Sequence, residues 1–476
     1  MSVTIGDIVQ DQENNKVLSI KDLEVDFFTA RGRARAVRGL NLEVSRGEIL
    51  GIVGESGSGK SVTALAIMDL LPPGTGRIMS GSIIFDRNDL APIYSSKYRV
   101  AGRIGREKLR IRRMAVRGVE KKLAEQKGRI SMIFQDPLSS LDPLYKIDSQ
   151  LIESILYNNE EFMIGKSLDK NDILGRMSEF TNLLKEKSTE ELMDWINQNY
   201  GDGGFYKEVF FISNMSISES EKKIKIRRAL ACTKLLTPAE TRKLKAKLPD
   251  ATGRFFKPNN RRRLPIQGIR DPIVREAMLF SLELLEFVGM PNPENVLTSY
   301  PHELSGGMKQ RVMVALAVAN SPDILIADEP TTALDVTTQY QVLYLLKSIN
   351  RKLKTTVIFI THDLGVMAAV ADRIAVMYAG RIVEIGPARH FFDDPLHPYT
   401  SGLLKSVPQY DERVRKLYNI PGQVPDIRKL PSGCAFHPRC ERVMDICKES
   451  DPVDENVNER RVQCWLYSDG VKHGSR

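Results

Sequence analysis

The sequence predicts an α/β protein built around a mainly parallel sheet, and two features of the chain support this fold class. Three short runs, residues 49–53, 324–327 and 357–360, are apolar throughout, as expected of strands that are covered on both faces. A glycine-rich turn follows the first run directly, and residues with the apolar spacing of a helix follow the turn. A strand that leads through a turn into a helix is the building unit of α/β proteins.

The first elements, between residues 17 and 53, read as strands separated by turns, one of them a basic turn around Gly32. Residues 40–44 alternate between apolar and polar side chains, which is the period of a half-buried strand. We expect these N-terminal strands to form an antiparallel β subdomain. The helix after the glycine-rich turn, SVTALAIMDLL, is expected to stop at Pro72 and Pro73.

Composition places the chain among globular proteins. Its 476 residues exceed one compact core, while 42% hydrophobic and 27% charged residues are ordinary values. No apolar run has the length of a membrane span, and the N-terminus lacks a signal peptide, so we expect a cytosolic chain that reaches a membrane through a partner. The net charge of +9 comes largely from residues 103–127 and 222–263, a distribution that argues against a specific nucleic-acid surface.

Residues 54–61 read GESGSGKS and fit the pattern G-x-x-x-x-G-K-[ST] between a predicted strand and a predicted helix. Glycines allow a backbone with positive φ, so consecutive N–H groups can point at a phosphate chain, and the helix adds its positive end. We expect Lys60 to contact the β- and γ-phosphates and the Ser61 hydroxyl to ligate Mg²⁺. The predicted loop consists of Gly54, Glu55, Ser56, Gly57, Ser58, Gly59, Lys60 and Ser61.

The run ILIADE, residues 324–329, ends in two carboxylates, as expected of a buried strand whose tip reaches a ligand. We expect Asp328 to hold Mg²⁺ through water and Glu329 to act as the general base for the attacking water. A carboxylate engaged with a metal is a poor proton acceptor, so the two roles fall to different residues.

Four further motifs follow the same order along the chain: IFQDP with Gln135, LSGGMKQ at residues 304–310, TTALD with Asp335, and FITHDL with His362. Together with the glycine loop and the acidic strand, these motifs across residues 18–400 resemble the ATPase subunits of ABC transporters. The resemblance implies a P-loop NTPase core with a helical subdomain, and ATP and Mg²⁺ as ligands.

The resemblance also implies roles for individual residues. Gln135 contacts the metal and the attacking water, His362 contacts the γ-phosphate, and Asp335 belongs to the D-loop. A phosphate held by the opposite subunit meets the helix end formed by the signature residues Leu304, Ser305, Gly306, Gly307 and Gln310. An aromatic side chain stacks on adenine, and either Phe27 or Phe28 is the candidate.

The phrases SMIFQDPLSSLDPLY, YPHELSGGMKQRVMVALAVAN and DDPLHPYTSGLLKSVP, with the tail PGQVPDIRKLPSGCAFHPRC, resemble the D-type ATPases of oligopeptide, dipeptide and nickel importers. Four tail cysteines, Cys434, Cys440, Cys447 and Cys464, have the residue types of a Cys₄ site, although their spacing matches no standard zinc or ferredoxin pattern. Some members of this subfamily hold a [4Fe–4S] cluster there; zinc and reduced structural thiols are the alternatives.

The expected organisation is an ATPase domain over residues 17–400, interrupted by insertions at about 93–128 and 156–271, and a C-terminal extension over residues 401–476. The basic insertions depart from the family pattern and are read as solvated elaborations, with contact to anionic lipid as the alternative.

The resemblance implies ATP-driven uptake of oligopeptides or dipeptides at the cytoplasmic face of the membrane. The implied partners are integral membrane permease subunits, an F-type ATPase paralogue in a heterodimer, and an extracellular solute-binding protein. The alternatives are an importer ATPase for nickel or another small solute, a soluble ABC ATPase acting on nucleic acid or ribosomes, and an ABC-like protein without turnover.

Overall fold

The computed structural model describes residues 15–30, 32–86, 88–90, 128–136, 140–157, 191, 272–332, 334–406 and 418–468. These residues belong to two compact units, one made of residues 1–141 and 305–476 and the other of residues 142–304. Both predicted insertions lie almost wholly outside the described residues, as does Ala333 of the TTALD motif. Within the described ranges, no helix combines the length and the hydropathy needed to cross a bilayer.

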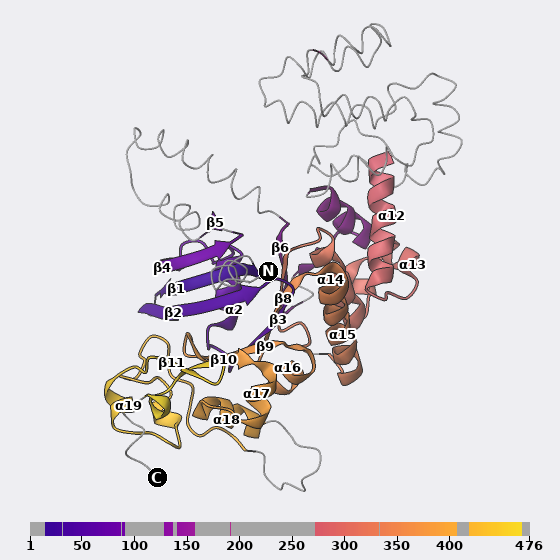
Figure 1. The fold of residues 1–476 in the computed structure, drawn as a ribbon. Coiled ribbons are helices and arrows are strands. Elements are labelled where there is room, and N and C mark those ends of the chain that lie inside the picture. Colours follow the sequence, from indigo (N-terminus) through magenta and orange to yellow (C-terminus); the bar gives the residue numbers. More distant parts are fainter. Residues whose placement is uncertain are drawn as a thin grey trace, which may run out of the picture. The chain divides into compact units, whose positions relative to one another are not determined.

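The first unit contains the expected antiparallel sheet, with strand order β2-β1-β4-β5 (Figure 1). Its strands are β1 (Lys16–Thr29), β2 (Gly32–Ser45), β4 (Gly76–Phe85) and β5 (Asn88–Asp89). The sequence placed a basic turn around Gly32, but Gly32 already pairs with Thr29 as the first residue of β2. Its φ of 112° is readily accessible to glycine, so the hairpin closes more tightly than the sequence suggested.

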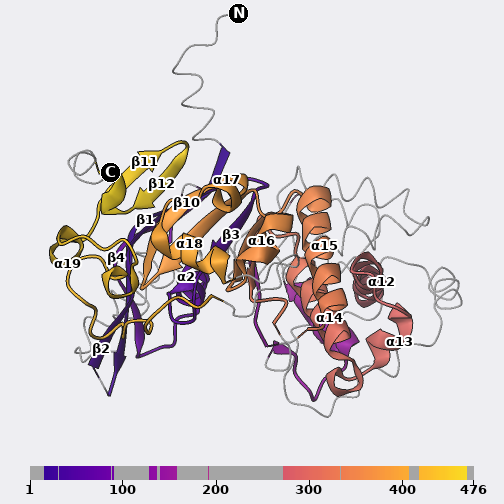
Figure 2. The same cartoon turned by 90° about the horizontal axis from the view of Figure 1, so that it is seen from below.

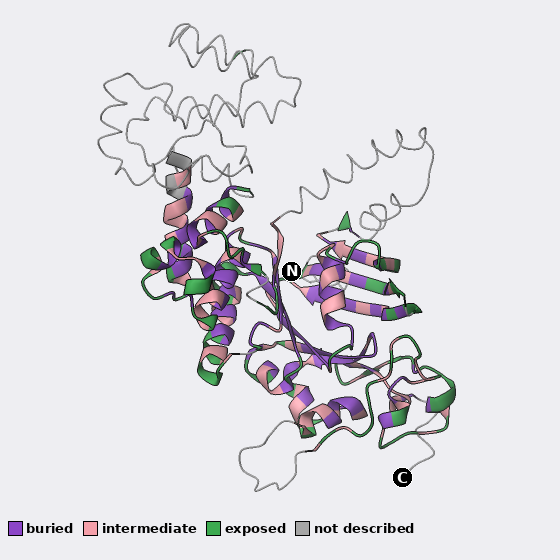
Figure 3. Ribbon diagram, turned by 180° about the vertical axis from the view of Figure 1, so that it is seen from behind, coloured by how far each residue is buried: buried purple, intermediate pink, exposed green. Residues whose placement is uncertain are grey.

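The same unit contains an eight-stranded sheet, and the prediction of a buried parallel core is confirmed. Its parallel strands are β3 (Ile49–Val53), β6 (Ile130–Ile133), β7 (Ile324–Asp328), β8 (Thr356–Thr361) and β9 (Arg373–Tyr378). Every residue of β3, β7 and β8 is buried, as Figure 3 shows for the centre of the sheet. These strands therefore hold the predicted loop and acidic motifs on a rigid support.

One edge of this sheet was not anticipated. The strands β10 (Arg381–Pro387), β12 (Arg460–Gln463) and β11 (Asp454–Val457) continue it beyond β9 with antiparallel pairing. Figure 2 shows the two C-terminal strands beside β10. The last residues of the chain thus complete the sheet that carries the glycine loop.

The first unit also contains the helices that connect or flank these strands. The helix after the glycine loop ends at Ile67, well before Pro72, because Asp69 turns into the left-handed region with φ 56°. The expected continuation to the prolines is therefore wrong. The helices are α2 (Lys60–Ile67), α14 (Gly306–Val318), α15 (Val336–Leu353), α16 (Leu364–Val370), α17 (Ala388–Asp393), α18 (Pro398–Lys405), η4 (His437–Arg439), α19 (Ile446–Glu449) and η5 (Trp465–Tyr467).

A shared hydrophobic core joins the antiparallel sheet, the parallel sheet and α2. It includes Leu23 from β1, Leu50 from β3 and Ile67 from α2, all almost completely buried. Burying such a side chain contributes about 1.5–3 kcal/mol each. The core therefore fixes α2, and through it the glycine loop that precedes the helix, against both sheets.

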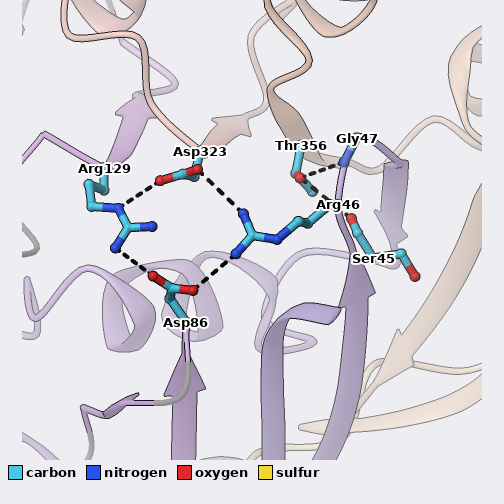
Figure 4. A network of polar contacts seen from close by, with 7 residues as sticks. All are labelled: Ser45, Arg46, Gly47, Asp86, Arg129, Asp323 and Thr356. Carbon is cyan, nitrogen blue, oxygen red and sulfur yellow. Dashed lines mark hydrogen bonds and ion pairs between the residues drawn. The ribbon is translucent and has the colours of Figure 1, made fainter. Parts of the chain in front are cut away.

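An ion-pair network connects residues that lie just before or just after several strands (Figure 4). Arg46 and Arg129 each contact both Asp86, at the end of β4, and Asp323, before β7. Four contacts of 2.7–3.5 Å thereby connect the antiparallel sheet to the parallel one. The four side chains are about one-third exposed, so the network adds little to the free energy of unfolding. Its main effect is to fix the positions of the strands relative to one another.

The second unit is helical in its described part. It contains a helix over residues 147–157, α12 (Pro272–Phe287), α13 (Pro293–Thr298) and the short turn η3 (Pro301–Glu303). The backbone N–H of Ile147 donates to the carbonyl of Ser299 over 3.0 Å, which brings its two sequence-distant segments together.

Candidate functional site

The glycine loop lies between β3 and α2, as the sequence predicted. Gly59 has φ 104° and serves as the N-cap of α2. A Cβ at Gly54 would lie 2.2 Å from the carbonyl oxygen of Met377, and one at Gly59 would lie 2.6 Å from that of Ala36. Any side chain at either position collides with backbone, so both glycines are sterically required. At the tip, Ser56 and Gly57 are exposed, while Ser58 is buried.

The Lys60 ammonium group is held inside this loop. Only 5% of the residue is exposed, and its Nζ donates to the carbonyl oxygens of Gly54 over 2.7 Å and Glu55 over 3.0 Å. Burial lowers the pKa of Lys60, although the nearby carboxylates of Glu329 and Asp328 oppose that shift. The lysine thus lies in the same electrostatic neighbourhood as the acidic end of β7.

Ser61 and Asp328 form a pair of oxygen donors. The Ser61 hydroxyl donates to Oδ1 of Asp328 over 3.1 Å, and Asp328 is 6% exposed. Burial raises the pKa of Asp328 because the charged carboxylate has lost hydration. Hydroxyl and carboxylate oxygens are the ligands that Mg²⁺ prefers, so the chemistry of this pair fits the predicted metal.

Glu329 is surrounded by three side chains. Its Oε2 accepts hydrogen bonds from Gln135 Nε2 over 3.1 Å and from Thr332 Oγ1 over 3.0 Å, and its Oε1 lies 3.3 Å from Nδ1 of His362. The residue has φ 45°, a region that a non-glycine residue rarely adopts and that is common at functional sites. The structure therefore brings together Gln135, Glu329 and His362, which are 227 positions apart at most.

Thr332 was missed by the sequence reasoning. It follows Glu329 by three residues, and its backbone N–H also donates to the Glu329 carbonyl over 3.2 Å, which closes a turn. The sequence did contain a signal for Thr332, because a hydroxyl side chain three residues after the carboxylate that ends a strand can reach back to it. Gln135 donates to Glu329 in the described structure, and the contact with the metal and the attacking water that the resemblance implies for it stays a prediction.

The signature residues begin α14. Ser305 is the N-cap, and its Oγ accepts from the backbone N–H of Met308 over 3.3 Å. Ser305 and Gly306 are exposed, and nothing lies within 4 Å of a Cβ built on Gly306. Leu304 is buried, and Gln310 is 2% exposed, so these two predicted side chains face the protein interior. The accessible part of the signature is the helix end itself.

Asp335 is the N-cap of α15. Its carboxylate accepts from the backbone N–H of Thr338 over 2.9 Å and from the Thr338 hydroxyl over 2.7 Å. Both hydrogen bonds stabilise the charged form and lower the pKa of Asp335. The predicted D-loop residue therefore also fixes the start of the helix that follows the acidic strand.

The two candidate adenine-stacking residues differ in their surroundings. Phe27 packs partly against the shared core that contains α2, and its ring edge lies 3.2 Å from a Cβ built on Gly76. Phe28 is 38% exposed, and the Arg77 guanidinium lies 5.2 Å from its ring centroid. Phe27 is thus on the face of β1 that looks toward the glycine-loop helix.

The four tail cysteines lie in one neighbourhood without forming disulfides. Burial raises the pKa of Cys434 to about 11 and that of Cys464 to about 12, and the charges of the other thiols add to both shifts. The backbone N–H of Cys434 donates to the Cys447 carbonyl over 2.9 Å. Within the described residues, no three or more His, Cys, Asp or Glu side chains are arranged to hold a metal ion.

The C-terminal residues also reach the glycine loop, which no local sequence signal predicted. The backbone N–H of Glu55 donates to Oη of Tyr399 over 2.9 Å, and the Glu55 carboxylate accepts from Arg439. These partners are 344 and 384 positions away. Such contacts depend on the path of the whole chain and cannot be deduced from spacing.

Comparison with known proteins agrees with this arrangement. The family described as "ABC transporter" matches residues 37–237 and 263–332, and "Oligopeptide/dipeptide transporter, C-terminal region" matches residues 383–447. The dipeptide transport ATP-binding protein DppD of Bacillus subtilis is 34% identical over 96% of this chain and 97% of its own length.

Two oligopeptide transport ATP-binding proteins named OppD are similarly related. That of Bacillus subtilis is 35% identical over 95% of this chain and 89% of its own length. That of Escherichia coli is 34% identical over 95% of this chain and 94% of its own length. With the glycine loop, the acidic strand and the signature helix in the order of the matched family, the chain belongs to the ABC transporter family, as an ATPase with the C-terminal region of the oligopeptide and dipeptide transporters.

Proposed function

We propose that this chain is the ATP-hydrolysing subunit of an importer that takes up oligopeptides or dipeptides across the cytoplasmic membrane. The observation that carries the hydrolytic part is the Glu329 carboxylate, held between Gln135, Thr332 and His362. The peptide part is supported by the match of residues 383–447 to the oligopeptide and dipeptide transporter region and by the names of the relatives.

In the proposed reaction, Lys60 exchanges its two carbonyl partners for phosphate oxygens of ATP. Glu329 accepts the proton of the attacking water, and Gln135 and Thr332 keep its carboxylate oriented. His362 contacts the γ-phosphate from the other side of Glu329. Mg²⁺, held by Ser61 and Asp328, supplies charge neutralisation to the phosphates when bound.

The exposed start of α14 supports a second ATPase subunit in the proposed complex. Free backbone N–H groups at a helix N-terminus bind phosphate, and Ser305 and Gly306 leave this end open to solvent. One chain then contributes half of each of two sites, with an F-type ATPase paralogue as the other half. Permease subunits, a solute-binding protein and a position at the cytoplasmic face of the membrane complete the proposed complex.

For the four tail cysteines, the sequence alternatives remain a [4Fe–4S] cluster, zinc and reduced thiols. Their shared neighbourhood supports a common role, while their side chains form no coordinating set in this structure. An absorbance band near the edge of the visible range in anaerobically purified protein distinguishes a cluster from the other two. Metal analysis of the same sample then distinguishes zinc from bare thiols.

The test of the proposed function uses the full chain assembled with its membrane partners in liposomes. Labelled dipeptide, labelled oligopeptide and nickel are offered as cargo, and ATP hydrolysis is measured in parallel. We expect ATP-dependent peptide uptake and a loss of about 100-fold or more in hydrolysis for Glu329→Gln. The exposed Glu294→Gln is the matched control and should keep the native rate.

Each outcome decides a different part of the proposal. Nickel uptake without peptide uptake would replace the cargo. Undiminished hydrolysis in Glu329→Gln would remove the assigned base. Copurification with RNA in place of membrane proteins would favour the soluble ABC ATPase instead.

A further inference from the structure

Glu55 is the point at which the C-terminal segment, defined here as residues 418–468, touches the glycine loop. Its carboxylate accepts two hydrogen bonds from Arg439, from Nη1 over 2.6 Å and Nη2 over 3.0 Å. Its carbonyl oxygen accepts from Lys60 Nζ over 3.0 Å. One residue is thus held by the C-terminal segment and itself holds the lysine that meets the phosphates.

The Arg439 guanidinium is fixed in place by further contacts. Its side chain is 4% exposed, its Nε donates to the Pro421 carbonyl over 2.9 Å, and its Nη1 lies 3.4 Å from Oη of Tyr378. The hydrogen bonds to Glu55 raise the pKa of Arg439, so the cation persists at every accessible pH. A buried, bidentate guanidinium of this kind is a rigid support rather than a passing surface contact.

A second contact holds the Glu55 backbone from the same direction. The Tyr399 hydroxyl accepts the Glu55 N–H over 2.9 Å, and its ring packs between Tyr378 and Phe436 with centroids 4.6 and 5.3 Å away. Phe436 belongs to the C-terminal segment, between Cys434 and Arg439. The aromatic cluster therefore connects the cysteine loop to the backbone of the phosphate loop.

The ion pair of Glu55 and Arg439 also has an electrostatic effect, in addition to its effect on packing. Glu55 places a carboxylate inside a loop whose expected ligand is the polyphosphate of ATP, and an unpaired negative charge there would repel that ligand. Arg439 neutralises the carboxylate at hydrogen-bond distance. Without the guanidinium, the loop would lose both its outer support and its charge balance.

We propose that Arg439 is a positioning residue for nucleotide binding, which acts through Glu55 to hold the glycine loop in its phosphate-binding shape. The C-terminal segment thereby sets the affinity of this chain for ATP. The inference rests on the proposed function, because it assumes that the loop binds ATP. It adds a regulatory link between the cysteine-bearing region and the nucleotide site.

The test measures the dissociation constant of MgADP for the full chain by calorimetry, and the ATPase rate of the assembled complex. Arg439→Gln should weaken MgADP binding by about 10-fold and raise the KM for ATP, with little change in kcat. Glu55→Gln combined with Arg439→Gln should bind better than Arg439→Gln alone, because the repelling charge is gone, but more weakly than native, because the two hydrogen bonds that support the loop are still missing. Arg428→Gln removes an exposed guanidinium paired with Asp426 in the same segment and should bind like native.

Two conservative variants keep the inference testable if Arg439→Gln does not fold. Tyr399→Phe removes only the hydroxyl that accepts the Glu55 N–H, and Arg439→Lys keeps the charge without the bidentate geometry. Both should weaken MgADP binding, each by less than Arg439→Gln. Native affinity in all three variants would overturn the inference, as would a double variant that binds no better than Arg439→Gln.

The two proposals fail in different ways. A native chain that does not bind ATP, or a Lys60→Ala variant that binds it normally, would end the proposed function. A native chain that binds ATP, with Arg439→Gln binding equally well, would end only this inference.

Discussion

At the residue scale, the structure distinguishes the two candidates for the side chain that stacks on adenine. Phe27 and Phe28 could not be distinguished in the sequence, because both follow the same strand pattern. Phe27 packs against the core that includes α2, whereas Phe28 has its ring near Arg77. Adenine must lie on the side of the glycine loop, so Phe27 is the better placed of the two.

We therefore expect Phe27→Ala to weaken MgADP binding by about 5- to 150-fold, which corresponds to the loss of about 1–3 kcal/mol from one aromatic stacking contact. Phe28→Ala is the matched control and should change binding less than about 2-fold. Binding of inorganic pyrophosphate, which has no base, should be equal in both variants. The reverse order of effects between the two variants would assign the role to Phe28.

A second residue-scale feature concerns His397, which is 1% exposed and whose Nδ1 accepts the N–H of Tyr399 over 3.0 Å. Burial lowers its pKa to about 3, while an unfolded histidine titrates near 6.5. The unfolded state therefore binds a proton that the folded state excludes. The stability contributed by this histidine is complete above about pH 6.5 and is lost as the pH falls toward 3.

His397→Asn keeps a side-chain acceptor for the N-cap of α18 but cannot titrate. The variant should be less stable than native at pH 7.5, since it leaves a smaller side chain in a buried site. At pH 5.5 that difference should shrink by about 1 kcal/mol, because only the native chain then gains a proton on unfolding. Unfolding by urea at both pH values measures it, and parallel losses in the two proteins would contradict the assignment.

The same scale shows why some site residues could be predicted and others could not. Glu329 follows a buried strand directly, and Lys60 follows one after the glycine loop, so local pattern and position agree. Thr332 acts through a turn in which Glu329 has φ 45°, a conformation that the local pattern does not indicate. Arg439 and Tyr399 contact Glu55 across hundreds of residues, and nothing in local spacing encodes such a distance.

At the element scale, the strands buried on both faces were predictable and the ends of elements were not. Strands β3, β7 and β8 each contain an apolar run of four or five residues, because each strand is covered on both faces. The end of α2 depends on Asp69 in a left-handed conformation, which competes with the helical pattern that continues to Leu71. The strand β12 has alternating burial and only four residues, too short for its period to be recognised.

The start of α14 is an element whose two glycines have separable roles. A Cβ at Gly307 would lie 2.9 Å from Cγ2 of Thr338 on α15, whereas a Cβ at Gly306 would meet no atom within 4 Å. Of these two glycines, packing against the described residues requires Gly307 and does not require Gly306. The role proposed for Gly306 is to leave space for the phosphate that approaches this helix end from the second subunit.

Gly306→Ala should accordingly leave the melting temperature of the isolated chain unchanged or slightly raised, since alanine favours the helix. It should lower the ATPase rate of the assembled complex by about 10-fold or more, because a methyl group occupies the approach to the N–H groups. Gly307→Ala should instead destabilise the isolated chain. Equal ATPase rates for native and Gly306→Ala complexes would argue against phosphate binding at this end.

At the scale of the first unit, the C-terminal segment is attached to the nucleotide-binding core by two buried arginines. Arg439 contacts the glycine loop, and Arg460 of β12 lies 3.5 Å from the carboxylate of Glu384 on β10. Both members of the second pair are almost fully buried, at 2% and 0% side-chain exposure. The expected boundary near residue 401 stays a prediction, but the physical connection across it is extensive.

The second pair allows this attachment to be measured. Arg460→Met removes the cation and leaves Glu384 buried, where burial already raises its pKa. Breaking a buried pair from one side costs about 3–5 kcal/mol, so the free energy of unfolding should fall by that amount. Arg389→Met is the matched control, because Arg389 joins the same two segments through an exposed contact with Glu459 and should cost under about 1 kcal/mol.

Adding Glu384→Gln to Arg460→Met should recover only part of the loss. A neutral amide is cheaper to bury than a carboxylate without its cation, but the amide keeps one acceptor for the backbone N–H groups of Leu396 and His397, both of which the carboxylate accepts. Unfolding in urea is followed by tryptophan fluorescence in a Trp195→Phe background, so that the signal comes from Trp465, which follows β12 and donates to the Ser450 carbonyl over 3.0 Å. If Arg460→Met and Arg389→Met were equally mild, the attachment of the C-terminal segment would not depend on the pair of Arg460 and Glu384. Arg439 would then have to be held in position against Glu55 by contacts other than this pair, if it is to control the affinity for ATP.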